Sequence, residues 1–228
     1  PGTQARIYLQ QNQPEEAEAA FIKAIQVNPA DITNYVALCL LYLPEKNYDA
    51  AEREAKAGLK IKPDNSDLKL VLAEVYDQKG NKEGAIQELR ELLDKDPKNV
   101  RAYYKMADLG PSGPDQAWKK YYLIKLISLA PANIVLRLQL AELFAAANQT
   151  DSSLFYLQGV KKIAPDFSVN AKTSYNQAAS SLQGNQPLKA LPYLQQFHEL
   201  MKTTSAYADG IDEIEVPQMI AGYPQFTA

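Results

Sequence analysis

The sequence predicts an all-α fold, a right-handed superhelical solenoid built from antiparallel helix pairs. Three observations predict it: prolines recur at a constant interval of 34 residues, small and aromatic residues keep that interval, and turn signals separate the apolar stretches. A constant period of this length indicates stacked repeats rather than one mixed core. The prolines that set the interval are Pro29, Pro63, Pro97, Pro131 and Pro165.

Two columns of small residues and one of aromatic residues predict two helices in each repeat. Small residues allow two helices to approach closely, while aromatic and leucine side chains fill the space between neighbouring repeats. Proline after the second helix ends it, because proline lacks an amide donor. The columns are Ala5, Cys39, Ala73, Ala107 and Ala141; Tyr8, Tyr42, Tyr76 and Phe144, with Gly110 as the exception; and Ala17, Ala51, Ala85 and Ser153, broken at Lys119.

The repeats divide the chain into six units and a tail. Unit one lacks the start of its first helix, which leads us to expect that the sequence is part of a longer protein. Unit four ends its first helix early, at Gly110-Pro111-Ser112-Gly113-Pro114, and unit six needs three extra residues around Val169. We expect the units at about 1–31, 32–65, 66–99, 100–133, 134–167 and 168–202, and an acidic non-repeat tail or linker at 203–228.

These columns, and the stretch from Tyr48-Asp49-Ala50-Ala51-Glu52 through Pro63-Asp64-Asn65, resemble the tetratricopeptide repeat family over residues 1–202. The resemblance implies a non-catalytic scaffold whose first helices line a concave groove that holds a peptide or protein segment. Projected onto this chain, the groove comprises Val36, Leu40, Leu70, Glu74, Arg101, Tyr104, Lys105, Asp108, Leu138 and Glu142, with Arg6, Thr33, Ala37, Asp67, Val71 and Gln139 on the same wall.

The projected wall has two interpretations. Tyr104 flanked by Arg101 and Lys105 has the composition of a binding hot spot. The aliphatic residues could instead pack between adjacent first helices.

Some family members hold the carboxyl terminus of heat-shock chaperones in a clamp of Lys, Asn and Arg residues. Here only Arg101 and Lys105 correspond to clamp residues, because Val36, Leu40 and Val71 occupy the other places. Docking of that kind is disfavoured, since a carboxylate would lose hydration against aliphatic side chains without gaining partners.

The tail differs from the repeats in charge and pattern. No basic residue follows Lys202, whereas Asp209, Asp212, Glu213 and Glu215 are acidic. Three alternatives stay open: a linker to a further domain, a short strand or coil that caps the last unit, or a segment that occupies a groove as a ligand mimic. Alternation over 211–216 suggests strand rather than helix, and Pro217 and Gly222-Tyr223-Pro224 argue against a seventh unit.

Composition excludes several function classes. The net charge of −3, with basic residues spread along the chain, argues against nucleic acid as a partner. The single cysteine, Cys39, is expected to be a small core residue, and the single histidine, His198, a surface or half-buried residue rather than a general base. We expect no metal, no cofactor, no enzymatic activity and no membrane span.

The leading functional prediction is therefore a protein-interaction scaffold. The alternative is a structural repeat region that positions a downstream catalytic or surface domain, with the tail capping the solenoid. Abundant Gln, Asn and Ser beside a single Cys favour an exported or periplasmic bacterial protein over a cytoplasmic one.

Overall fold

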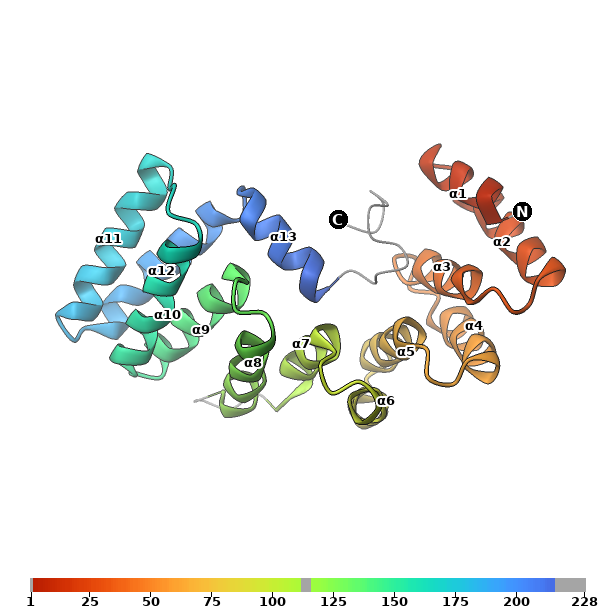
Figure 1. Cartoon of the computed structure of the whole chain (residues 1–228), viewed down its shortest axis with the longest axis horizontal. Coiled ribbons are helices and arrows are strands. Elements are labelled where there is room, and N and C mark those ends of the chain that lie inside the picture. Colours follow the sequence, from red (N-terminus) through yellow and green to blue (C-terminus); the bar gives the residue numbers. More distant parts are fainter. Residues whose placement is uncertain (1, 112–115, 216–228) are drawn as a thin grey trace. The chain divides into compact units, whose positions relative to one another are not determined.

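A computed structural model describes residues 2–111 and 116–215, and these residues form thirteen helices and no strand (Figure 1). The fold is an all-α solenoid of helix pairs, as the sequence predicts. The described residues divide into two compact units, 2–102 and 103–215, which we call the amino-terminal and carboxyl-terminal units.

The amino-terminal unit consists of three helix pairs and the start of a seventh helix. Each second helix packs against the first helix of its own pair, and α3 and α5, the first helices of two successive pairs, also contact each other. The helices are α1 (Gly2–Gln10), α2 (Pro14–Val27), α3 (Ile32–Tyr42), α4 (Tyr48–Ile61), α5 (Ser66–Gln78), α6 (Lys82–Lys95) and α7 (Val100–Leu109).

The carboxyl-terminal unit contains most of α7 and six further helices. In this unit α9 packs against α10 of its own pair, and it also contacts α12 and α13. The six helices are α8 (Ala117–Leu129), α9 (Ile134–Ala146), α10 (Thr150–Ile163), α11 (Val169–Gln183), α12 (Pro187–Met201) and α13 (Ser205–Ile214).

A column of capping residues starts four of the first helices. The side-chain oxygens of Asp31, Asn65, Asn99 and Asn133 each accept a main-chain amide two or three residues on. Such caps satisfy amide groups that have no partner within the helix. The four residues are spaced by 34, a column that our sequence analysis did not use.

The small-residue columns lie at helix contacts, as predicted. Cys39 and Ala51 are both fully buried, and so are Ala141 and Ser153. The expectation that Cys39 is a small core residue is therefore confirmed.

Helix α7 ends at Leu109, in agreement with the predicted early end of that helix. The indole of Trp118 packs directly on Gly110, and its Nε1 donates to the carbonyl oxygen of Met106 at 2.5 Å. The remainder of the glycine- and proline-rich loop, Ser112-Gly113-Pro114, lies outside the described residues.

The sixth helix pair departs from the pattern of the others. The helix of this pair that packs on α9 is its second, α12, whereas in the amino-terminal unit α5 meets the first helix α3.

The beginning of the predicted tail is a helix, Ser205–Ile214, which corrects the alternative that it is a short strand or coil. Thr204 caps α13, and Tyr207, Gly210 and Ile214 are its buried residues. Their spacing of three and four residues is the helical period, which local alternation over 211–216 concealed. Pro217 and Gly222-Tyr223-Pro224 lie outside the described residues. The unit boundaries and the role of the tail stay predictions.

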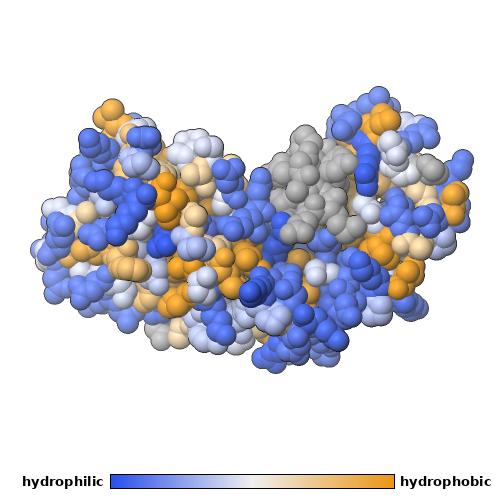
Figure 2. Space-filling view, viewed as in Figure 1, coloured by the Kyte–Doolittle hydropathy of each residue, from blue (hydrophilic) through white to orange (hydrophobic). Residues whose placement is uncertain are grey.

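Hydrophilic residues cover much of the face shown in Figure 2, interrupted by apolar patches. Within 2–111 and 116–215, no helix has the length and apolar character needed to cross a membrane.

Candidate functional site

The amino-terminal unit contains a pocket of about 600 Å³ where its first helices begin. A volume of this size falls within the range of ligand sites in proteins. The pocket is formed by the starts of α3, α5 and α7 and by the turns that precede them. It is lined by Ala30, Asp31, Ile32, Thr33, Lys62, Asp64, Asn65, Ser66, Asp67, Leu70, Asp96, Asn99 and Arg101.

Six of the thirteen lining residues are charged, with four aspartates against Lys62 and Arg101. Two of the aspartates, Asp31 and Asp96, lie in the turns before α3 and α7 and accept main-chain amides. Asp31 accepts from the Thr33 amide and from Asn34 Nδ2, each at 3.1 Å. Asp96 accepts in the same way from the amide of Lys98 and the side chain of Asn99. Local backbone geometry therefore fixes these carboxylates at the pocket.

Asn65 is a buried residue of the pocket lining at the start of α5. Its side chain is 7% exposed, and its Oδ1 accepts from the Leu68 amide at 2.9 Å to cap α5. Among the described residues, no acceptor receives a hydrogen bond from its Nδ2. Asn99 differs, since its Nδ2 donates to Asp96 at 3.0 Å.

Two of the predicted groove residues, Leu70 and Arg101, line this pocket, together with Thr33 and Asp67 of the projected wall. Leu40 instead lines a separate pocket of about 220 Å³ between the ends of α1 and α3. Val36 is fully buried, which favours the packing interpretation for that residue.

Glu74 is half-buried on α5. It accepts a hydrogen bond from Gln78 at 2.9 Å.

The other predicted groove residues belong to the carboxyl-terminal unit. Tyr104 is 7% exposed, and its hydroxyl accepts from Gln139 at 2.9 Å. Burial raises the pKa of Tyr104 above its ordinary value. Leu138 is buried, Lys105 is half-buried, and the exposed Asp108 is paired with Lys119 at 2.7 Å. The hot-spot prediction thus has no exposed Tyr104 ring to support it, and the groove assignment stays a prediction.

Glu142 meets the only histidine of the chain. Its Oε1 lies 2.5 Å from His198 Nδ1, while the other ring nitrogen of His198 lies 3.0 Å from the Tyr207 hydroxyl. His198 thereby joins α12, α9 and α13. The half-buried position expected for His198 is confirmed, although neither partner could be identified from sequence.

Asn133 makes the principal polar contact between α9 and α13. Its Nδ2 donates to the carbonyl oxygen of Gly210 at 2.9 Å and to Glu213 Oε2 at 2.8 Å. A Cβ on Gly210 would lie 2.9 Å from Val135 Cγ2, so only glycine permits this approach without displacement. Sequence reasoning missed Asn133, although the 34-residue column of capping residues could have indicated it.

Among the described residues, no group of three or more His, Cys, Asp and Glu side chains is placed to hold a metal ion.

Family models for the tetratricopeptide repeat match residues 2–31 and 42–109. No curated protein sequence matches the chain.

Solved structures similar to the chain include PilW, titled a widely conserved type IV pilus biogenesis factor, at 15% identity and a TM-score of 0.61, covering 91% of this chain and 95% of PilW. PilF of Pseudomonas aeruginosa is similar at 19% identity and a TM-score of 0.63, covering 91% and 93%. YrrB, titled a TPR protein with an unusual peptide-binding site, is similar at 18% identity and a TM-score of 0.53, covering 83% and 96%.

At such low identities these likenesses show the fold alone. The repeat columns and the two family matches identify residues 2–31 and 42–109 as tetratricopeptide repeats, and the fold of the described residues agrees with that family.

Proposed function

We propose that the protein is a non-catalytic scaffold that binds a peptide segment of a partner protein in the pocket of its amino-terminal unit. The observation that carries the proposal is the pocket of about 600 Å³, which includes Leu70 and Arg101 of the groove predicted from sequence. The repeat fold supports a protein-interaction scaffold in general, and the similar YrrB is a TPR protein with an unusual peptide-binding site.

The physical argument rests on shape and on available polar groups. The pocket is concave, it contains the apolar Leu70 beside charged and amide groups, and it lies on rigid helix starts. Peptide binding requires apolar contact together with donors and acceptors for the main chain. The residues of the lining supply both.

Site-specific photo-crosslinking tests the proposal. A benzoylphenylalanine introduced at Lys62, which lines the pocket, is expected to capture a discrete partner in the native cells. The same substitution at Lys60, an exposed residue of α4 outside the lining, is the matched control. Equal capture at both positions, or none at either, would remove the support for a site in this pocket and would favour the structural-repeat alternative.

We also propose an exported or periplasmic location. The support is compositional, namely abundant Gln, Asn and Ser with a single cysteine. Fractionation of the native cells checks it, and recovery of the protein in the cytoplasmic fraction would contradict it.

A further inference from the structure

The structure contains one example of how a first-helix cap of this chain recognises another segment. Asn133 caps α9 through Oδ1, which accepts from the Leu136 amide at 3.2 Å. Its Nδ2 reaches outward and donates to the main-chain carbonyl oxygen of Gly210 at 2.9 Å. The same side chain therefore starts one helix and holds the backbone of another.

Asn65 occupies the equivalent place two repeats earlier. It lies 68 residues, or two intervals of 34, before Asn133, and its Oδ1 caps α5 in the same way. Both side chains are more than nine-tenths buried, at 7% and 2% exposure. Because Oδ1 is engaged in capping, Nδ2 of Asn65 is the group that remains to donate into the pocket.

The two other members of the column lack this freedom. The Nδ2 of Asn99 donates to Asp96, and Asp31 carries no amide. Within the amino-terminal unit, Asn65 is thus the capping residue that matches Asn133 in chemistry. Asn133 lies against α13, whereas Asn65 lines the pocket.

The charge around Asn65 differs from that around Asn133. Asp64 and Asp67 flank Asn65, whereas Ala132 and Val135 stand at the matching positions near Asn133. Over the whole lining, four aspartates oppose two cations. Asp31 accepts an amide group at the start of α3, so the positive end of that helix is partly neutralised. An acidic segment such as α13 would be repelled here, and a basic one attracted.

We propose that Asn65 donates a hydrogen bond to the main-chain carbonyl of a Gly in a basic partner segment, and that the pocket aspartates select Lys or Arg side chains of that segment. We expect glycine at this place because a Cβ on Gly210 would lie 3.1 Å from Oδ1 of Asn133 itself, and Asn65 presents the same side chain. This inference rests on the proposed function and names the class of partner.

The probe is a synthetic peptide with the sequence of residues 203–215, in which Asp209, Asp212, Glu213 and Glu215 are each replaced by Lys. It retains Gly210 and carries the charge that the pocket requires. We expect the full chain to bind it saturably in fluorescence anisotropy, with an affinity that falls as NaCl screens the charges. The unmodified acidic peptide, and a basic peptide that also carries Gly210→Leu, are each expected to bind at least about tenfold more weakly.

Asn65→Ser isolates the amide. Serine caps helices well, so α5 keeps its start, but the side-chain amide donor is lost. We expect the affinity for the basic peptide to fall about tenfold without a change in the melting temperature. Asn81→Ser is the matched control, because Asn81 caps α6 through the same contact outside the pocket.

Equal affinity of the Asn65→Ser and Asn81→Ser variants would overturn the inference, as would equal or tighter binding of the acidic peptide. Photo-crosslinking at Lys62 distinguishes a wrong role for Asn65 from a wrong proposed function. If capture of the native partner persists in the Asn65→Ser variant, the pocket is a binding site and the role of Asn65 is wrong. If capture at Lys62 is absent as well, the proposed function fails with it.

Discussion

The thiol of Cys39 donates a hydrogen bond to the main-chain carbonyl oxygen of Ala51, 3.3 Å away. Three intervals of 34 residues later the roles are exchanged, since the Ser153 hydroxyl donates to the carbonyl oxygen of Ala141 at 2.8 Å. Both pairs lie where the two helices of a repeat touch, and all four residues are fully buried. Either helix of a pair can therefore carry one small polar side chain at this contact, provided that the side chain donates to a main-chain carbonyl of the other helix.

Substitutions at this contact are expected to lower stability according to the hydrogen bond that they remove or the side-chain volume that they add. Ser153→Ala should cost about 0.5–1.5 kcal/mol for the buried hydrogen bond. Cys39→Ala should cost less than about 1 kcal/mol, because a thiol is a weak donor. Cys39→Leu should cost about 1–3 kcal/mol through overpacking. Urea denaturation measures each value, and a Leu variant as stable as the Ala variant would show that the helices can separate.

The Gly110–Trp118 contact predicts a position that accepts only glycine. A Cβ on Gly110 would lie 1.9 Å from Trp118 Cδ1, so Gly110→Ala must displace the indole and break its hydrogen bond to Met106. We expect a loss of about 1–3 kcal/mol. Because Trp118 is the only tryptophan, its fluorescence reports the displacement directly.

Gly184→Ala is the control for that substitution. At Gly184 the nearest atom to an added Cβ is 3.4 Å away, so the expected change in stability is small. An unchanged tryptophan spectrum in Gly110→Ala would contradict the packing described here.

Lys69 is a buried cation that forms ion pairs with two carboxylates of α6. Its Nζ lies 2.9 Å from Glu91 and 3.3 Å from Glu88. Desolvation lowers the pKa of Lys69, but the two carboxylates outweigh it and hold the pKa above its ordinary value. Lys69→Met should therefore cost about 1 kcal/mol, because both carboxylates lose their partner while they remain within reach of water. Lys60→Met, at an exposed position of α4, should change the urea midpoint little, and a similar loss in both variants would show that α6 does not depend on Lys69.

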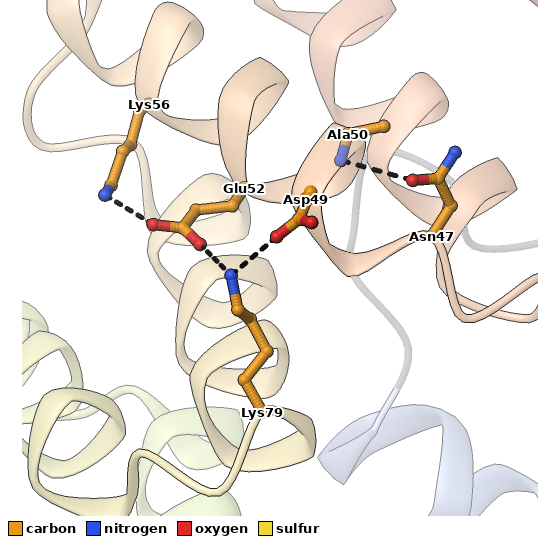
Figure 3. A network of polar contacts seen from close by, with 6 residues as sticks. All are labelled: Asn47, Asp49, Ala50, Glu52, Lys56 and Lys79. Carbon is orange, nitrogen blue, oxygen red and sulfur yellow. Dashed lines mark hydrogen bonds and ion pairs between the residues drawn. The ribbon is translucent and has the colours of Figure 1, made fainter.

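The acidic network in Figure 3 predicts a pH dependence. Glu52 lies 2.5 Å from Lys56 and 2.8 Å from Lys79, which also reaches Asp49 and so links α4 to the end of α5. Hydrogen bonds from Lys56 and Lys79 hold the pKa of Glu52 below its ordinary value of 4.5.

Because the folded-state pKa of Glu52 is depressed, its contribution to stability is present above pH 4.5 and is lost as the pH falls through the lower folded value. Glu52→Gln should lower the melting temperature at pH 7 by no more than about 3 °C, since the network is partly exposed. The difference from the wild-type protein should shrink below pH 4.5. A difference that stays constant from pH 7 to pH 3 would mean that the charge of Glu52 contributes nothing.

Part of the candidate site could be predicted from sequence. Leu70 and Arg101 were projected onto a groove and line the pocket, because a period of 34 residues fixes which positions of the first helices share a face. Val36, Tyr104 and Leu138 were projected onto the same wall but are buried, because neighbouring helices cover them. The repeat period predicts which face of its helix a side chain occupies. It does not predict whether a neighbouring helix covers that face.

The column of capping residues likewise has features that the sequence predicts and features that only the structure shows. The spacing of Asp31, Asn65, Asn99 and Asn133 is visible in the sequence and predicts four helix starts. It does not reveal that the Nδ2 of Asn99 is occupied by Asp96, that of Asn133 by Gly210, and that of Asn65 by no described residue. Those differences depend on the acceptor groups, from side chains or the main chain, that neighbouring turns and distant helices supply.

By itself the sequence determined the helix pairs, their small-residue contacts and the early end of α7, because local propensity and a constant period act within about 34 residues. Tertiary structure alone decided that α12 rather than α11 packs on α9, and that the acidic segment forms α13 against Asn133 and His198. Both outcomes depend on contacts between residues up to 80 positions apart, such as Asn133 with Glu213. No pattern within one repeat encodes such contacts.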